Sequence, residues 1–78
     1  MPKLKESTNQ ARGRRITAAL KKGLIDRGWT QAHLATLLRL SRERTNHAVN
    51  HPLAHRMEDV FKIADFVGVD LSEAVGRQ

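Results

Sequence analysis

The sequence predicts an all-α domain built from five short helices. Apolar residues recur at three- and four-residue spacing along most of the chain, which is the pattern of helices with one buried face. No segment alternates apolar and polar residues as a half-buried strand does, and the 78 residues include only two Phe, one Trp and no Tyr. Because cysteine is absent, neither disulfides nor a thiolate metal site can support the fold.

The first expected helix runs from about Arg12 to Arg27 and ends at Gly28, since glycine takes up the left-handed conformation without penalty. Before it, residues 1–11 are polar and basic and lack any periodicity, so we expect them to form a flexible arm, and residues 12–78 to form the domain. The side chains expected on the buried face of this helix are Ile16, Ala19, Leu20 and Leu24, and Trp29 is expected to anchor the following connection.

Two helices are expected to follow in close succession. Thr30 and Ser41 are favourable N-caps and predict helices over about 31–38 and 42–50. The second of these is expected to end before Pro52, because helical geometry is unfavourable for the residue that precedes a proline. The expected inner side chains of the 31–38 helix are Leu34, Ala35 and Leu38.

The last two helices are expected over about 56–66 and 71–75. Gly68 is the stop for the first of them, and Asp70 with Glu73 three residues later is a capping box for the second. The apolar side chains expected to face inward from the 56–66 helix are Met57, Val60, Phe61 and Ala64.

Positive charge is concentrated in one part of the chain. The formal net charge is +6, but residues 57–78 carry five acids against Lys62 and Arg77, so the basic side chains lie almost entirely before residue 57. Segregated basic charge of this kind indicates a polyanionic partner, such as nucleic acid.

The expected helix over 42–50 has one wholly polar side. At 100° per residue, that side gathers groups that can hydrogen-bond to the edges of bases, while Thr45, Ala48 and Val49 fall on the opposite side. The alternative is an ordinary solvated surface, although such surfaces are mostly mixed Glu and Lys. The residues on the polar side are Arg42, Glu43, Asn46, His47 and Asn50.

Residues 31–50, QAHLATLLRLSRERTNHAVN, resemble the helix-turn-helix of the lambda-repressor-like family, which includes phage Cro and repressor proteins. The likeness lies in Gln31, Leu34-Ala35, Leu38, Leu40-Ser41 and Ala48. The later segment KIADFVGVDLSEAV is similar to the family's fourth and fifth helices, so the resemblance covers about residues 16–76.

Two positions depart from the family pattern. Arg39 stands where the family usually has glycine at the turn, so the turn either changes shape or accepts strain. Thr45 stands where the family prefers Val or Ile, and we expect its hydroxyl to bond back to the carbonyl of Ser41.

The resemblance implies roles for individual side chains. Arg42, Glu43 and His47 occupy positions that meet base edges, flanked by Asn46 and Asn50. Arg42 suits guanine, whereas Glu43 either accepts from a cytosine amine or stabilises the helix dipole. Arg44 either contacts phosphate or pairs with an acid. The resemblance also implies phosphate contacts for Thr30, Gln31 and Ser41, with capping alone as the alternative. The basic side chains that we expect to follow either a groove or the DNA backbone are Arg14 and Arg15, assigned to phosphate, with Lys3, Lys5 and Arg12.

His47, His51 and His55 are spaced four residues apart, as on a metal-binding helix face. Because Pro52 interrupts the helix, we expect that these three side chains do not share a face and that no metal or other cofactor binds. With no thiol, no grouped carboxylates and no glycine-rich phosphate loop, we also expect no enzymatic activity.

The sequence therefore predicts a cytoplasmic transcriptional regulator of the repressor or Cro type that binds double-stranded DNA as a homodimer. Two alternatives remain open, an antitoxin-like protein-interaction module with autoregulatory DNA binding and a non-specific nucleoid binder. No apolar run is long enough to span a membrane. The apolar residues that either form the dimer contact or close the core are Phe66, Val69, Leu71 and Val75.

Overall fold

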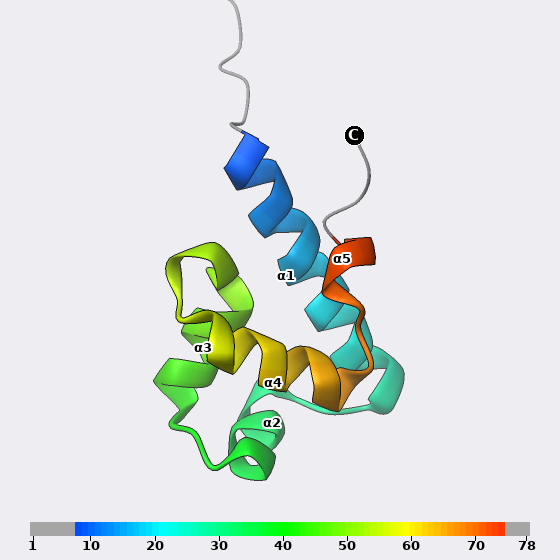
Figure 1. Ribbon diagram of the computed structural model, residues 1–78. Coiled ribbons are helices and arrows are strands. Elements are labelled where there is room, and N and C mark those ends of the chain that lie inside the picture. The colour runs from blue at the N-terminus through cyan, green and yellow to red at the C-terminus, as the bar shows by residue number, and fades with distance from the viewer. Residues whose placement is uncertain (1–7, 75–78) are drawn as a thin grey trace, which may run out of the picture.

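The computed structural model describes residues 8–74, which form five α-helices and one turn of 3-10 helix (Figure 1). There is no β-strand in this described part of the chain. The prediction of an all-α domain of five helices is therefore confirmed. In chain order the elements are α1 (Thr8–Arg27), α2 (Gln31–Leu38), α3 (Arg42–Asn50), η1 (Pro52–Ala54), α4 (Met57–Val67) and α5 (Leu71–Ala74).

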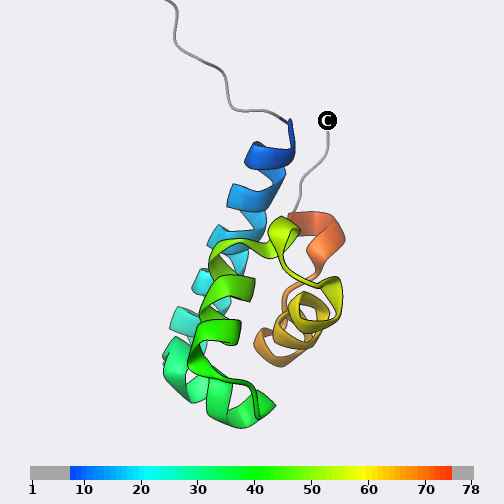
Figure 2. The same ribbon diagram turned by 90° about the vertical axis from the view of Figure 1, so that its left-hand side faces the viewer.

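The long helix α1 is the element around which the others pack. It contacts α3, η1, α4 and α5, while α2 packs against α3 and α4. Figure 1 shows α4 crossing α1 and the short α5 lying beside it. In the turned view of Figure 2, α3 faces the viewer with α1 behind it, so that one side of α3 is left open.

The helix ends are set by the residues that the sequence indicates. The hydroxyl of Thr30 accepts a hydrogen bond from the His33 N–H at 3.0 Å, and the hydroxyl of Ser41 accepts one from the Arg44 N–H at 3.0 Å. Gly28 and Gly68 follow α1 and α4 with φ of 70° and 71°, the left-handed conformation that ends a helix. These four predictions are confirmed.

The turn between α2 and α3 keeps a left-handed residue without using glycine. Arg39 has φ 59° and ψ 39°, and its N–H bonds to the carbonyl of Thr36 while the next N–H bonds to that of Ala35. This conformation costs a residue with a Cβ about 1–2 kcal/mol. The sequence left open whether this turn changes shape or accepts strain at Arg39. The structure has the strained, left-handed Arg39.

The core is aliphatic and lies where α1, α2, α3 and α4 meet. Gly23 lets α1 and α4 approach closely, since a Cβ at this position would lie 2.9 Å from the Cβ of Val67. The fully buried apolar side chains are Leu20, Leu34, Ala48, Val49, Val60 and Ile63, with Trp29, Leu38, Val69 and Leu71 packed partly buried against the cluster.

Two details of the helices differ from the sequence-based expectation. Helix α1 begins at Thr8 rather than Arg12, so residues 8–11 are helical. Met57 and Phe61, expected in the core, are 37% and 53% exposed. Helix α4 instead buries the stripe Val60, Ile63, Ala64 and Val67, which has the regular spacing of one helix face and leaves the larger Met57 and Phe61 outside it.

None of the helices between Thr8 and Ala74 combines the length and the apolar character that crossing a bilayer requires.

Candidate functional site

Helix α3 has a polar side open to solvent and a small, closely packed inner side. Its inner side chains Thr45, Ala48 and Val49 have no exposed surface. The separation follows the helical period, because residues three and four apart share a face. The side chains exposed to solvent include all five that the sequence analysis singled out, namely Arg42, Glu43, Asn46, His47 and Asn50.

Helix α3 is capped at its start and hydrogen-bonded to α1 at its end. The Ser41 cap holds its first turn. At the other end, the Thr17 hydroxyl of α1 donates a 2.7 Å hydrogen bond to the carbonyl of Val49. This bond satisfies one of the carbonyls that a helix C-terminus leaves without an intrahelical donor. The exposed face of α3 therefore has a fixed position on the domain.

An ion pair joins α3 to α4. Arg44 donates to both carboxylate oxygens of Asp59, with Nε–Oδ2 at 2.6 Å and Nη2–Oδ1 at 3.0 Å. The carboxylate is fully buried, whereas the arginine side chain is 40% exposed. The hydrogen bond from Arg44, together with the one from His55, lowers the pKa of Asp59 to about 2 against the opposing effect of burial. Of the two roles left open for Arg44, the structure has it paired with an acid.

The histidines come together, and the expectation that they do not share a face is wrong. The Nδ1 atoms of His47 and His55 lie 2.8 Å apart, and the ring of His51 lies 5.2 Å from that of His47 between centroids. Pro52 does end the helix, as expected. The tight turn of η1 then reverses the chain and returns His55 to the side of α3.

His55 also contacts the buried carboxylate through its other ring nitrogen. Its Nε2 lies 2.7 Å from Oδ2 of Asp59, and its side chain is only 12% exposed. The order of contacts is thus Arg44 to Asp59, Asp59 to His55, and His55 to His47. Across residues 8–74, no three His, Cys, Asp or Glu side chains are arranged to hold a metal ion.

Thr45 does not make the hydrogen bond expected of it. Its backbone N–H bonds to the carbonyl of Ser41 at 3.0 Å, but its fully buried hydroxyl has no hydrogen-bond partner. The side chain faces the apolar core, where its methyl group fills space and its oxygen is unsatisfied. Thr45 therefore lies on the side of α3 opposite the polar residues, as predicted. The prediction that its hydroxyl bonds to the carbonyl of Ser41 is wrong.

The candidate phosphate contacts lie on three elements. Thr30 is exposed and Gln31 half-buried at the start of α2, and Ser41 is exposed at the start of α3. Arg14 is exposed and Arg15 half-buried on α1, within the helix expected there. Lys3, Lys5 and Val75 lie outside the described residues.

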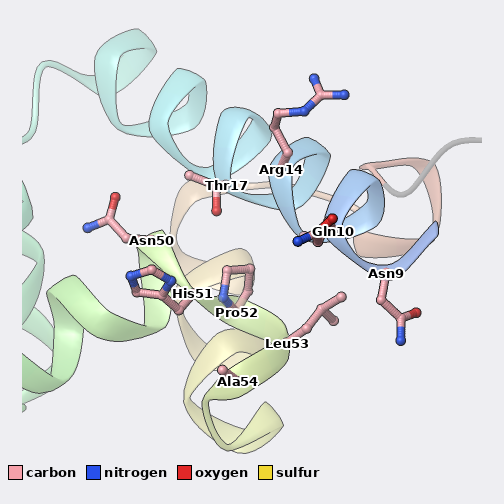
Figure 3. Close-up of a pocket in the computed structure, with 10 residues that line it drawn as sticks. Asn9, Gln10, Arg14, Thr17, Asn50, His51, Pro52, Leu53 and Ala54 are labelled. Carbon is pink, nitrogen blue, oxygen red and sulfur yellow. The ribbon is translucent and has the colours of Figure 1, made fainter. Parts of the chain in front are cut away.

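An open cleft of about 560 Å³ separates the first half of α1 from the segment that follows α3. Figure 3 shows Pro52 and Leu53 on one wall, facing Gln10 of α1, with the Arg14 side chain directed away from them. The cleft adjoins the C-terminal end of α3 through Asn50. It therefore lies between α1 and the C-terminal end of α3.

Of the apolar residues expected either at a dimer contact or in the core, Phe66 is 43% exposed. Val69 and Leu71 are partly buried and pack against the core cluster. These two side chains accordingly contribute to closing the core.

The sequence did not single out Asp59 as a member of the site, and it placed His55 in a four-residue series with His47 and His51 without predicting that their side chains meet. The four-residue spacing of His55 and Asp59, which places two side chains on one side of a helical segment, was a further indication. Comparison with protein-family models, with curated proteins and with solved structures found no match.

Proposed function

We propose that this protein is a sequence-specific regulator that binds double-stranded DNA with α3 in the major groove. The observation that carries the proposal is the exposed face of α3, where Arg42, Asn46, His47 and Asn50 lie on a helix that is capped at its start and hydrogen-bonded to α1 at its end. Arginine and asparagine hydrogen-bond in pairs to guanine and adenine edges, and one helix fits the groove.

The arrangement of α2 and α3 supports this assignment. The two helices pack against each other and are joined by only three residues, 39–41, as in a helix-turn-helix. In that motif the second helix enters the groove and the first lies across the backbone. The likeness of residues 31–50 to the lambda-repressor-like family supports the same docking, with Thr30, Gln31 and Ser41 at phosphates.

Charge supports the proposal as well. Residues 8–56 carry ten Lys and Arg against two acids, whereas residues 57–74 carry one Lys against five acids. Two side chains of the basic part are ion-paired, Arg44 with Asp59 and Lys22 with Asp26. The resemblance to the lambda-repressor-like family and the position of Arg14 and Arg15 on α1 make these two arginines candidate phosphate contacts.

The test is selection of bound sequences from a random pool of duplex DNA. A regulator of this kind enriches a short site, and Arg42→Ala lowers affinity for that site by about 5- to 150-fold, equivalent to 1–3 kcal/mol, while relaxing preference at one base pair. Lys62→Ala is the control, since it removes the same charge from the acidic part and leaves sequence preference unchanged.

Two results would count against the proposal. If no sequence is enriched at low or moderate salt, the protein either binds DNA without sequence preference or does not bind DNA. An equal loss for Arg42→Ala on selected and random DNA would place Arg42 at a phosphate instead of a base.

We further propose that the protein binds its site as a homodimer. Two copies would read half-sites about 34 Å apart, so the enriched sequence would be a pseudo-palindrome with that spacing. Sedimentation equilibrium with and without the selected duplex measures the stoichiometry, and one protein per asymmetric site would contradict the dimer.

A further inference from the structure

Three side chains form a hydrogen-bonded chain that runs from the core to the exposed face of α3. We call it the histidine relay: Asp59, His55 and His47. The Asp59 carboxylate contacts Nε2 of His55 at 2.7 Å, and Nδ1 of His55 contacts Nδ1 of His47 at 2.8 Å. Nε2 of His47 makes no hydrogen bond to any of residues 8–74 and belongs to an exposed residue.

The first contact fixes a proton on His55. Asp59 is buried against Arg44 and is ionised at neutral pH, because its pKa is lowered to about 2. An ionised carboxylate only accepts hydrogen bonds. The atom facing it, Nε2 of His55, must therefore carry a hydrogen and donate it.

The second contact, between the two Nδ1 atoms, determines which nitrogen of His47 carries a hydrogen. A neutral imidazole has one N–H and one lone pair, so neutral His55 with its hydrogen on Nε2 has a lone pair on Nδ1. The Nδ1 of His47 then has to donate to it. Neutral His47 therefore carries its hydrogen on Nδ1 and a lone pair on Nε2.

We propose that His55, held by Asp59, is a positioning residue that fixes the tautomer of His47 and so makes its Nε2 a hydrogen-bond acceptor for a base amino group. The inference rests on the proposed DNA binding and adds the chemical class of base at one position. An acceptor suits N4 of cytosine or N6 of adenine and is repelled by the acceptors of guanine.

One added proton reverses this polarity. If it resides on His47, both nitrogens of that ring carry hydrogen. If it resides on His55, Nδ1 of His55 donates and His47 takes its hydrogen on Nε2. Both states make Nε2 of His47 a donor, suited to the oxygen or N7 of guanine or to O4 of thymine.

The reversal requires one added proton on the two imidazoles, and histidine is the side chain that can gain a proton between about pH 8 and pH 5. Arg44 of α3 contacts Asp59, the ring of His51 lies 5.2 Å from that of His47 between centroids, and Glu58 of α4 acts electrostatically on Arg44. Asp59 stays ionised throughout this range, so the anchor of the relay does not change.

The tautomer of His47 can be measured on the full chain without DNA. Long-range proton–nitrogen NMR correlations at pH 8 distinguish a nitrogen that carries hydrogen from one that carries a lone pair. The expected spectrum has His47 with hydrogen on Nδ1, with His33 on α2 as an internal comparison outside the relay. Hydrogen on Nε2 of His47 at pH 8 would overturn the proposal, whatever the protein binds.

His55→Gln separates the relay from the fold. A glutamine amide can still donate to Asp59 but offers no nitrogen matching Nδ1, so His47 is expected to lose its fixed tautomer while the circular dichroism and thermal unfolding of the domain stay close to wild type. His47 keeping the same tautomer in His55→Gln would show that His55 does not set it.

The second measurement compares selection from random duplex DNA at pH 8.0 and pH 5.5. The position whose preference disappears in His47→Ala is expected to favour adenine or cytosine at pH 8.0 and to shift by about 3- to 10-fold toward guanine or thymine at pH 5.5, the size of one hydrogen bond. In His55→Gln this shift is expected to vanish. A preference at that position that is identical at both pH values in the wild type would contradict the proposal, whereas failure to enrich any sequence would contradict the proposed function alone.

Discussion

Helices α3 and α4 both pack against α1, but they are held there by different interactions. Helix α4 buries an unbroken aliphatic stripe that includes Val60, Ile63 and Val67. Helix α3 buries only Val49, Ala48 and the polar Thr45, and it adds one hydrogen bond from Thr17 of α1 and the ion pair of Arg44 with Asp59 of α4. Helix α4 therefore contributes the larger aliphatic area to the core, whereas α3 combines a small buried face with directed polar contacts.

This difference in buried side chains explains which helix can present polar side chains to a partner. A helix that commits few large side chains to the core can present most of its length to a partner. Polar contacts also fix orientation more narrowly than apolar burial does, since hydrogen bonds weaken steeply with angle. Helix α3 is therefore suited to a task in which side chains must be aimed.

The largest effect that would test this comparison is expected on α4. Ile63→Ala should lower the free energy of unfolding by about 2–5 kcal/mol, because it leaves a cavity in a fully buried position. Phe61→Ala, on the exposed side of the same helix, should cost less than about 1 kcal/mol despite removing a larger side chain. Urea unfolding followed by circular dichroism measures both, and equal losses would mean that Phe61 belongs to the core.

The polar attachment of α3 should respond to acid. The pKa of Asp59 is about 2 in the fold against a usual value of 3.8, so its stabilising contribution is fully present above about pH 5 and is lost as pH falls toward 2. The contribution amounts to about 2 kcal/mol at neutral pH.

Asp59→Asn should therefore lower stability by about 2 kcal/mol at pH 7 and flatten the decline of stability between pH 5 and pH 2. Unfolding free energies of variant and wild type across this range provide the test, with Asp65→Asn on the exposed part of α4 as the matched control. Parallel acid profiles for Asp59→Asn and wild type would show that the carboxylate does not stabilise the fold.

The smallest change in stability is expected from making the buried face of α3 wholly apolar, as in the stripe of α4. Thr45→Val replaces a buried hydroxyl that has no partner with a methyl group of similar size. We expect a gain of about 1 kcal/mol in the free energy of unfolding, since an unsatisfied buried hydroxyl costs about 1–3 kcal/mol in proteins. A loss of stability measured by thermal or urea unfolding would indicate that the hydroxyl is satisfied by water in solution.

Features set by local rules were predictable from the sequence. The ends of α2, α3 and α4 follow from Thr30, Ser41 and Gly68, each acting within one turn of chain. The start of α1 was not predictable, because residues 8–11 contain neither a clear helix-terminating residue nor an apolar stripe. The exposed face of α3 was predictable because polarity along one helix follows from its period alone.

Features that depend on two elements at once were not predictable. Apolar spacing along the helix suggested that Phe61 would be buried, but the face of α4 is decided by which stripe fits the space left by its neighbouring helices. The burial of Asp59 depends on Arg44 arriving from another helix, and the meeting of His47 with His55 depends on the reversal at η1. Pro52 marked the break correctly without indicating where the chain would go next.

The single turn of η1 makes the connection between α3 and α4 sensitive to its length. Surface loops usually tolerate inserted residues. Here one residue added between His51 and His55 would rotate His55 by about 120° around the 3-10 axis and carry it away from α3, while the helices and the core remained in place. A variant with such an insertion would keep its fold and lose only the link between its buried carboxylate and its surface imidazole.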